Sequence, residues 1–328
     1  MIAARAMNLR LVEEIMAEPG GEHLLTCWSC GACAATCLVR RYNPAFNPRR
    51  ILHRAGLGLR EAVLSSAEIW QCSACDACYP RCPQQIHISR VMQAIRNVAI
   101  REGYQAPGPS AQVEATTCIA CGLCVAACPY EAISLQRMPV NGAERLVAQV
   151  DANKCLACGI CNAVCLSSSI AVLGHEDAAL AEALVGGEKP LTPLLVVTCN
   201  WCLNAEADLA YAQHPPEGVR VANVPCTGRL TPAFVTVALH KRADALLVVG
   251  CQEEECHYKH GNRLEKTRAR QVQGLLELLG VEPERAQFAW LSQLDRGRFP
   301  ALVEQSLAKA RQLGPLPWGA REGSKHVG

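Results

Sequence analysis

Cysteine is the residue that most constrains this chain, because 21 of its 328 residues are cysteines and most of them recur in a fixed pattern. Sixteen fall into four runs that share the spacing Cys-x2-Cys-x2-Cys-x3-Cys. The runs are CWSCGACAATC at 27–37, CSACDACYPRC at 72–82, CIACGLCVAAC at 118–128 and CLACGICNAVC at 155–165. So many thiols exceed the needs of core packing, which leaves disulfides, zinc or iron-sulfur clusters as explanations.

Charge and hydropathy exclude several classes of protein. The chain has 32 basic and 30 acidic residues, a net charge of +2 and no basic stripe interleaved with aromatic residues, so nucleic acid is not an expected partner. Its first residues place apolar side chains at helical spacing and lack the continuous apolar stretch of a signal peptide. No run of about 18 apolar residues predicts a membrane span. We therefore expect a cytoplasmic location, where disulfides are rare, and the odd number of cysteines also argues against them.

The surroundings of the runs predict two cysteine-rich domains. A length of 328 residues favours two or three domains. Around the first two runs, apolar positions recur every three or four residues after Pro48 and again after Cys82 up to Gly103, so residues 1–105 are expected to be all-helical. Around the other two runs, the β-type segments QVEATT, AISLQ, LVAQVD and SIAVLG follow the linker QAPGPS. Residues 106–175 therefore read as a duplicated α+β domain with one run in each half.

The pattern changes in the last part of the chain. After a polar connection around 175–190, the continuous apolar strands LLVVTC, RVANVPC, DALLVVGC and QFAWLS alternate with helical stretches. Strands of this kind predict a parallel sheet covered on both faces, so residues 191–313 are expected to form a small α/β domain. Residues 314–328 look like a mobile tail. The predicted fold class is multidomain, with an α-helical domain, an α+β domain and a parallel-sheet α/β domain.

The spacing within each run favours a 4Fe-4S cluster. Three cysteines at intervals of three residues let one tight loop place three thiolates around a cubane, whereas zinc favours two Cys-x2-Cys hooks a dozen or more residues apart. In two-cluster ferredoxins the fourth cysteine ligates the other cluster, and this rule predicts four complete 4Fe-4S sites here. The ligand sets are Cys27, Cys30, Cys33 and Cys82; Cys72, Cys75, Cys78 and Cys37; Cys118, Cys121, Cys124 and Cys165; and Cys155, Cys158, Cys161 and Cys128.

Five further cysteines lie in the expected α/β domain. They are Cys199, Cys202, Cys226, Cys251 and Cys256. Three of them directly follow a predicted strand, and in parallel α/β sheets ligands bind outside the carboxyl ends of the strands. One edge of the sheet should therefore gather these thiols. Four of them could hold a 2Fe-2S cluster, which we favour, or a structural zinc, and the fifth would stay a lone thiol.

Several neighbouring residues could tune these sites, but we assign them no site role. The proline that usually follows the fourth cysteine is present as Pro83 and Pro129 and replaced by Leu38 and Leu166, which bears on loop stiffness rather than on ligation. Cations after the first run could raise a cluster potential, although a solvated helix face or a partner contact explains them as well. These cations are Arg40, Arg41, Arg49 and Arg50. Loop contacts and packing are also the ordinary roles of His257, Trp201 and Trp290.

The first two cysteine-rich domains resemble known families. CWSCGACAATC followed by the NPRR helix, and IWQCSACDACYPRCP followed by a helix ending in AIRN, resemble the C-type subunit of heterodisulfide reductase over about the first 100 residues. That resemblance implies an α-helical two-cluster ferredoxin. The next 65 residues or so are similar to bacterial two-4Fe-4S ferredoxins, which is a less specific match.

The α/β domain resembles a third family. CNWC at 199–202, PCTGR at 225–229 and GCQEEECHYKHGN at 250–262 are similar to the iron-sulfur delta subunit of methyl-viologen-reducing, F420-non-reducing hydrogenase. The resemblance covers nearly all of 191–313. It implies one 2Fe-2S cluster and a path for electrons from a hydrogenase to the flavin subunit of heterodisulfide reductase, without indicating which four of the five cysteines bind.

The sequence also lacks several signals of catalysis. It has no GxGxxG turn between a strand and a helix, no paired-cysteine CCG segment and no cysteine pairs of the nickel-iron kind. We therefore expect a non-catalytic electron-transfer subunit with four 4Fe-4S clusters and one 2Fe-2S cluster. Its expected partners are a flavin subunit of the heterodisulfide-reductase type and a hydrogenase, formate dehydrogenase or other dehydrogenase, in a complex that could bifurcate electrons. The alternatives are a free soluble polyferredoxin carrier and a zinc-stabilised interaction protein, which iron analysis would separate.

Overall fold

The protein is described here by a computed structural model. It defines residues 7–316 except positions 38, 41–42, 173–176, 187–191, 204, 242, 254, 293–294 and 296. The chain divides into two compact units. The first contains the residues up to Gly108 together with Asp151–Leu156, and the second contains Pro109–Val150 and the residues from Ala157 onward.

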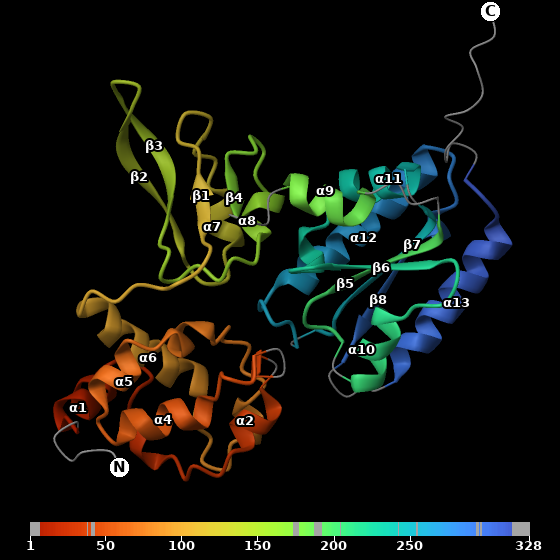
Figure 1. Ribbon diagram of the computed structural model, residues 1–328. Helices are drawn as coiled ribbons and strands as arrows, with labels where there is room; N and C mark the ends of the chain where they lie inside the picture. Colours follow the sequence, from red (N-terminus) through yellow and green to blue (C-terminus); the bar gives the residue numbers. More distant parts are fainter. Residues whose placement is uncertain are drawn as a thin grey trace, which may run out of the picture. The chain divides into compact units, whose positions relative to one another are not determined.

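The regular elements described in the first unit are all helical (Figure 1). The α-helices are α1 (Leu9–Ala17), α2 (Ala32–Thr36), α4 (Pro48–Gly56), α5 (Arg60–Leu64) and α6 (Ile88–Arg101). The 3-10 turns are η2 (Leu24–Thr26), η3 (Ala67–Gln71) and η4 (Tyr79–Arg81). Asparagine side chains cap two of the helices, because Asn8 accepts from the Arg10 amide and Asn47 from the Arg50 amide. Proline at the first position of α4 has no amide hydrogen to leave unpaired, so this helix begins at Pro48.

Helix α6 forms the centre of this unit. It packs against α1, α4, α5 and η3, and its side chains Met92, Ile95 and Val98 are at most 1% exposed. On the same helix the buried Arg96 donates hydrogen bonds to the carbonyl oxygens of Ile69 (2.7 Å) and Cys72 (2.6 Å). The central helix therefore fixes the chain where the second cysteine run begins.

The second unit starts with two small antiparallel sheets. Its first elements are β1 (Ala111–Val113), α7 (Leu123–Ala127), β2 (Ile133–Val140), β3 (Ala143–Val150), α8 (Ile160–Ala163) and β4 (Ile170–Val172). Strand β1 pairs with β4, and β2 pairs with β3. The β2–β3 hairpin is longer than the predicted segments because Asn141 and Gly142, with φ of 52° and 81°, form a two-residue turn that matches the twist of a hairpin.

A parallel sheet dominates the rest of the second unit and confirms the predicted parallel-sheet domain. Its strands are β5 (Thr192–Cys199), β6 (Val219–Val224), β7 (Ala243–Cys251) and β8 (Ala286–Leu291). The strand order is β6-β5-β7-β8, and all three pairings are parallel. Strands β5 and β7 are almost wholly buried, which explains why they read as continuous apolar runs.

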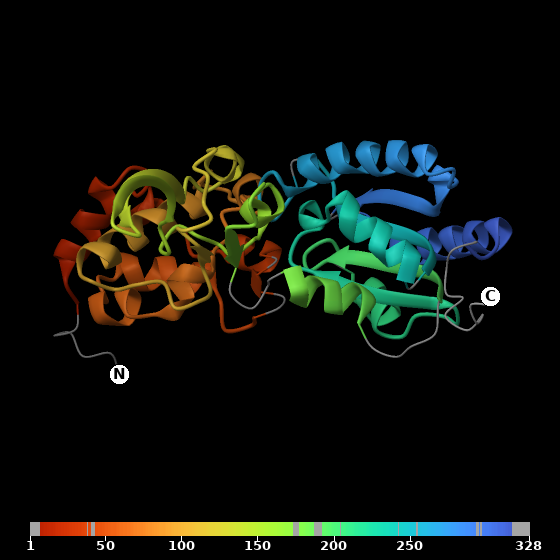
Figure 2. The same cartoon turned by 90° about the horizontal axis from the view of Figure 1, so that it is seen from above.

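Helices cover both faces of this sheet, as Figures 1 and 2 show. They are α9 (Asp177–Val185), α10 (Glu206–Gln213), α11 (Pro232–Lys241), α12 (Gly261–Leu278) and α13 (Arg298–Leu313), with 3-10 turns η5 (Thr227–Arg229) and η6 (Pro283–Arg285). Leu195 and Val197 of β5 share one buried cluster with side chains of α9, α11 and α12, whereas α10 and α13 lie on the other face. The cysteines of this domain lie at the carboxyl ends of β5, β6 and β7 or in the loops that follow them.

Two segments differ from the sequence-based expectation. The stretch around 175–190, expected to be a connection, contains helix α9, because DAALAEALV is rich in the helix formers alanine and leucine. The beginning of the expected tail is packed, since Leu316 is 3% exposed and its amide donates to the Asp244 carboxylate at 2.9 Å. Residues 317–328 lie outside the described part.

None of the helices described between residues 7 and 316 combines the length and the apolar composition needed to cross a membrane.

Candidate iron-sulfur sites

All four cysteine runs share one backbone conformation. The residue two positions after the first cysteine has φ of 53–54° in each run, at Ser29, Ala74, Ala120 and Ala157. The residue after the second cysteine also has positive φ, at Gly31, Asp76, Gly122 and Gly159. A left-handed conformation costs a residue with a Cβ roughly 1–2 kcal/mol, so its repetition in four loops indicates a common structural demand. Successive amides in such turns form concave sites that suit an anionic group.

The second run departs from the other three. Its positive-φ position after the second cysteine is Asp76, whose carboxylate accepts a hydrogen bond from the Ser89 hydroxyl at the start of α6. In the other three runs a left-handed glycine precedes a short α-helix, whereas here the 3-10 turn η4 follows Cys78. Asp76 thus ties its loop to α6 through a hydrogen bond. The glycines at the same position in the other three runs have no side chain and supply conformational freedom.

The first predicted ligand set lines one cavity in the first unit. Its walls include Cys27, Cys30, Cys33 and Cys82, with Trp28 and Arg49 beside them. The Ser29 amide donates to the Cys27 sulfur at 3.4 Å. Burial and the nearby Cys27 raise the pKa of the Cys33 thiol to about 11, so a bound cation would be needed to hold these groups as thiolates.

The second ligand set of this unit also gathers. Burial raises the pKa of Cys37 to about 11, and the charges of Cys72 and Cys75 add to that increase. The pKa of Cys78 is raised by burial and by the same two neighbours. Cys37 therefore lies within electrostatic reach of the cysteines of the next run.

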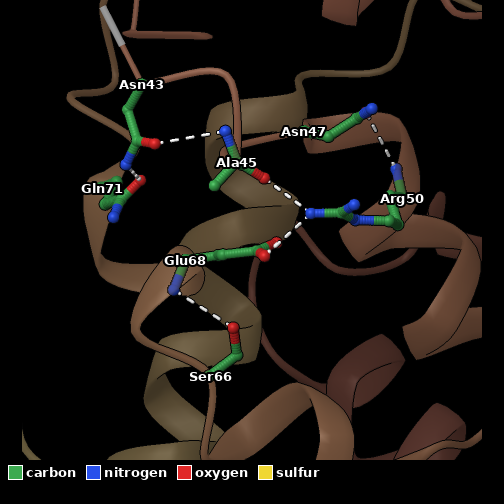
Figure 3. A network of polar contacts seen from close by, with 7 residues as sticks. All are labelled: Asn43, Ala45, Asn47, Arg50, Ser66, Glu68 and Gln71. Carbon is green, nitrogen blue, oxygen red and sulfur yellow. Dashed lines mark hydrogen bonds and ion pairs between the residues drawn. The ribbon is translucent and has the colours of Figure 1, made fainter.

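A polar network joins the segment after the first run to the segment before the second (Figure 3). The Arg50 guanidinium donates to the carbonyl oxygen of Ala45 at 2.6 Å and to the Glu68 carboxylate at 2.9 Å. The Asn43 amide donates to the Gln71 side chain at 3.0 Å, one residue before Cys72. Arg50 therefore has an internal structural role. Arg49, to which we assigned no site role from the sequence, lines the first cavity. Arg41 lies outside the described residues.

The third ligand set lines a cavity in the second unit. Its walls include Cys118, Cys121, Cys124 and Cys165, together with Ser167 and Ser169. The Ser169 amide donates to the Cys165 sulfur at 3.2 Å. Burial opposes ionisation of Cys165, but hydrogen bonds from Ser167 and Ser169 outweigh it and lower the pKa of this thiol. In the fourth run Cys158 and Cys161 are buried, and the Ala132 amide donates to the Cys128 sulfur at 3.4 Å.

The five remaining cysteines gather at the carboxyl edge of the parallel sheet, all at most 7% exposed. Cys199 ends β5 and Cys251 ends β7, and their sulfur atoms are 3.4 Å apart. Cys226 follows β6, and its thiol interacts with that of Cys256, which also interacts with Cys251. Hydrogen bonds from Cys226 and Cys251 lower the pKa of Cys256, whereas those of its two neighbours are raised. Contacts between sulfur atoms therefore run from Cys226 through Cys256 and Cys251 to Cys199.

Cys202 behaves differently from the other four. Its thiol donates to the carbonyl oxygen of Val249 at 3.2 Å and to that of Cys199 at 3.4 Å. These contacts give a protonated thiol two acceptors in the protein itself. A hydrogen bond with Cys202 is also the largest cause of the raised pKa of Cys199, so Cys202 lies beside the same group of thiols.

Buried polar side chains surround this thiol site. His257 is 2% exposed and stacks on Trp201 with ring centroids 3.6 Å apart, and burial lowers the pKa of its imidazole to about 3. Glu265 is 1% exposed and accepts a hydrogen bond from the Thr227 hydroxyl at 2.7 Å. Burial is the main reason why the pKa of Glu265 is raised to about 8. Sequence reasoning missed Glu265, because nothing in a polar helix pattern shows which acidic side chain faces the core.

These domains define a class of protein: a multidomain iron-sulfur protein whose ferredoxin-like parts precede a parallel-sheet domain. The family described as methyl-viologen-reducing hydrogenase, delta subunit, matches residues 194–314, and 4Fe-4S dicluster domains match residues 23–86, 71–133 and 117–169. The D-type iron-sulfur subunit of F420-non-reducing hydrogenase from Archaeoglobus profundus is 38% identical over 126 residues, which cover 38% of this chain and 91% of that protein. Through its carboxy-terminal domain the chain belongs to this family of hydrogenase iron-sulfur delta subunits.

Two further relatives extend over other parts of the chain. The A-type subunit of ferredoxin:CoB-CoM heterodisulfide reductase from Methanosarcina mazei is 33% identical over 231 residues, 70% of this chain and 28% of that protein. The C-type subunit of H2:CoB-CoM heterodisulfide,ferredoxin reductase from Methanothermobacter marburgensis is 35% identical over 92 residues, 28% of this chain and 49% of that protein. The chain therefore spans between about a quarter and a half of these two reductase subunits.

The thiols fit clusters in their number and placement. The dicluster matches show that the chain carries multiple 4Fe-4S clusters. Among the described residues, no group of three or more histidine, cysteine, aspartate or glutamate side chains is arranged to hold a single metal ion. In two of the predicted sets all four cysteines line the walls of one cavity.

Proposed function

We propose that this chain is an iron-sulfur electron-transfer subunit that relays electrons between a hydrogenase or other dehydrogenase and a flavin-containing complex of the heterodisulfide-reductase type. The observation that carries the proposal is the repeated loop. Four cysteine runs with the same backbone conformation are followed by a fifth, buried thiol site in one chain. The names of its relatives, which are iron-sulfur subunits of hydrogenase and subunits of heterodisulfide reductase, support it.

Four 4Fe-4S clusters would be held by the crossed ligand sets. Two sets are supported by the cavities that their cysteines line, namely Cys27, Cys30, Cys33 with Cys82 and Cys118, Cys121, Cys124 with Cys165. The electrostatic influence of Cys72 and Cys75 on Cys37 supports the set of Cys72, Cys75, Cys78 and Cys37. The fourth set, Cys155, Cys158, Cys161 and Cys128, follows from the same spacing rule.

The carboxy-terminal domain would hold one 2Fe-2S cluster. The ligands we propose are Cys199, Cys226, Cys251 and Cys256, because contacts between their sulfur atoms link all four. Cys202 would remain a thiol that donates to two carbonyl oxygens. A four-thiolate site buried at strand ends suits such a cluster, because burial and hydrogen bonds to sulfur are among the factors that set its potential.

The residues around the thiols would set how readily each site accepts an electron. Iron-sulfur clusters, when bound, supply one-electron transfer. The amides of Ser29, Ala132, Ser169 and Trp201 donate to cysteine sulfur atoms at 3.2–3.4 Å and would stabilise negative charge there. The carboxy-terminal thiols are at most 7% exposed, and this burial strengthens every charge interaction within that site.

The fusion of these domains in one chain has a kinetic consequence. Covalent linkage raises the effective concentration of each domain near the others and fixes their ratio at one to one. We propose that the donor is a hydrogenase, formate dehydrogenase or other dehydrogenase and that the acceptor is a flavin subunit, in a complex that splits electron pairs between two acceptors. Flow in the opposite direction would use the same contacts.

Anaerobic affinity purification of the tagged chain from its native host, with mass spectrometry of the co-purifying subunits, tests the proposal. A flavin subunit together with a hydrogenase or dehydrogenase is the expected result. Iron analysis of the same sample should give about 18 iron atoms per chain, from four cubanes and one 2Fe-2S cluster. A chain that purifies alone with full iron would overturn its assignment to a complex and make it a free carrier. Zinc in place of iron would overturn the redox role.

A further inference from the structure

Two buried arginines lie where the small two-sheet domain meets the parallel-sheet domain within the second unit. Arg229 is 1% exposed and Arg268 is 6% exposed. Arg229 belongs to η5, three residues after Cys226, and Arg268 lies on α12, which follows the loop of Cys256. Full burial of a guanidinium is costly unless its hydrogen bonds are satisfied inside the protein. Their partners therefore indicate what these two side chains do.

Arg229 connects the loop after Cys226 to helix α8 of the fourth cysteine run. Its guanidinium donates to the Asn162 side-chain oxygen at 3.1 Å. The Asn162 amide in turn donates to the carbonyl oxygen of Ile170 at 2.7 Å, so the contact continues into strand β4. Because Asn162 directly follows Cys161, the arginine is tied to the backbone that carries a predicted 4Fe-4S ligand.

Arg268 makes a second connection to the same helix. One of its terminal nitrogens donates to the carbonyl oxygen of Ala163 at 2.7 Å. The other donates to the carbonyl oxygens of Gly228 and Leu230, on either side of Arg229. Arg268 thus joins α8, η5 and α12 through backbone acceptors.

Glycines allow this close approach. A Cβ on Gly159 would lie 2.9 Å from the Arg229 side chain, and Gly159 immediately follows Cys158. A Cβ on Gly261 would lie 2.3 Å from the Cys226 sulfur, 3.5 Å from the Cys256 sulfur and 3.8 Å from the end of the Ile160 side chain. One glycine therefore separates the carboxy-terminal thiols from the first residue of α8. The two thiol sites are close neighbours.

We propose that Arg229 and Arg268 act together as a positioning pair, the arginine joint, which fixes α8 of the fourth cysteine run against the carboxy-terminal thiol site and places two positive charges beside that site. The inference rests on the proposed 2Fe-2S site. It assigns these residues two effects. They hold the neighbouring sites at a constant separation, and they favour the reduced, more negative state of the carboxy-terminal site.

The physical reason is the charge of the bound groups. A cluster held by four thiolates is anionic. When it gains an electron next to another anionic cluster, the repulsion between the two increases. This repulsion is strong because the protein interior screens charges only weakly. Two buried guanidinium groups offset that repulsion. Burial lowers the pKa of Arg268 to about 10, and the charge of Cys226 acts in the opposite direction, so this arginine stays charged at neutral pH and senses the thiol site.

The test uses the complete, cluster-loaded chain. Its variants remove the positive charge of each arginine and keep as much hydrogen bonding as possible. Glutamine keeps a donor but removes the charge, so the variants are R229Q, R268Q and the double variant. The control is R285Q, because Arg285 is also a buried arginine of this domain, 2% exposed, with bonds to Glu282 and to the carbonyl oxygens of Asp244, Leu313 and Gly314. Asp244 lies at the amino end of β7, roughly 23 Å along the strand from Cys251.

Two measurements separate the two effects. Redox titration followed by electron paramagnetic resonance should show the carboxy-terminal signal titrating at a lower potential in R229Q and R268Q. An equilibrium constant for reduction about tenfold smaller corresponds to about 59 mV for one electron. Hydrogen exchange of the peptide containing α8 should become about tenfold faster in the double variant. R285Q should change neither quantity.

The outcomes decide between the parts of the proposal. Potentials that match R285Q would overturn the charge effect, and unchanged exchange at α8 would overturn the joint. If the double variant does not fold, the single variants carry both measurements, with R229K and R268K expected to keep the wild-type potential. Absence of a 2Fe-2S signal in the wild-type chain would overturn the proposed cluster and the charge effect, whereas hydrogen exchange would still decide on the joint.

Discussion

The cysteine runs and the carboxy-terminal site present thiols in two different ways. Each run supplies three thiols of a proposed site from one short loop, and the fourth thiol comes from the other run of the pair. In two of the loops the second cysteine, Cys30 or Cys121, is exposed. The carboxy-terminal site collects residues from the ends of β5 and β7 and from loops up to 57 positions apart in sequence, counted from Cys199 to Cys256, and all of its thiols are buried. The first design takes most of its thiols from one loop and is open at its edge, whereas the thiols of the second are brought together by the tertiary fold.

This difference explains what glycine does in each place. In the runs, Gly122 and its equivalents adopt positive φ, and a Cβ on Gly122 would meet nothing within 4 Å. At the carboxy-terminal site, a Cβ on Gly261 would collide with the Cys226 sulfur. Gly122 needs glycine for backbone conformation alone, Gly261 needs it for space, and Gly159 needs it for both because a Cβ there would lie 2.9 Å from Arg229. Substitutions should therefore have local effects in the runs and wider effects in the assembled site.

The largest effect should follow from removing a ligand of the assembled site. Cys226→Ser or Cys251→Ser should abolish the 2Fe-2S signal in electron paramagnetic resonance and leave the cubane signals intact, because no other domain shares these thiols. Cys202→Ser is the matched control and should retain the signal, since its thiol already donates to Val249 and Cys199. Loss of the signal in the Cys202 variant, with retention in either of the others, would show that the assignment is wrong.

A second prediction compares the two kinds of glycine. Gly261→Ala should lower the free energy of unfolding by about 1–3 kcal/mol through overpacking and should reduce the iron content of the carboxy-terminal site, although alanine is the better helix former. Gly122→Ala should cost about 1–2 kcal/mol from the left-handed backbone and should spare that site. Denaturant unfolding and iron analysis of both variants test this. Equal loss of the 2Fe-2S signal in both would remove the distinction between the two designs.

The third prediction concerns the buried carboxyl group of Glu265 beside the assembled site. The pKa of Glu265 is raised to about 8 from 4.5. Between these two pH values Glu265 keeps its proton in the folded chain but loses it in the unfolded chain. The free energy of unfolding therefore falls as the pH rises toward 8. Glu265→Gln should remove this slope and unfold at higher denaturant than wild type above about pH 8, by at least about 1 kcal/mol. The difference in the free energy of unfolding between variant and wild type should shrink as the pH is lowered. Anaerobic urea unfolding at several pH values measures this difference, and a constant difference would contradict the prediction.

The contrast between the two designs also marks how far sequence reasoning reaches. The cysteine runs and the parallel strands were predictable, because the spacing of residues in a loop and a continuous apolar segment can both be read directly from neighbouring residues in the sequence. The β2–β3 hairpin had such a signal in Asn141-Gly142, although the predicted strands stopped short of it. Helix α9 was hidden by the glycine and polar residues that flank its alanine-rich centre.

The contacts that complete the assembled site had no local signal. Arg229 meets Asn162 across 67 positions, and Arg268 meets Ala163 across 105. In the sequence each arginine looks like any other helix or loop cation. Only the close packing permitted by Gly159 and Gly261 shows that these charges are inside the protein. Likewise, the proposed distinction between Cys202 and the other four thiols rests on the carbonyl oxygens that the Cys202 thiol reaches.

The smallest predicted effect lies in the first unit, where the supports of a local loop are partly open to water. Arg50→Met removes the ion pair with Glu68 and the hydrogen bond to Ala45, and side-chain exposures of 42% and 20% for the pair imply a loss of about 1 kcal/mol or less. The matched control is Arg54→Met on the same helix, outside the network of Figure 3. Denaturant unfolding should show a smaller change for the control, and cubane iron should stay bound in both. If Arg50→Met instead released iron from the second run, the loops would depend on long-range supports as much as the assembled site does, and the two designs would differ only in exposure.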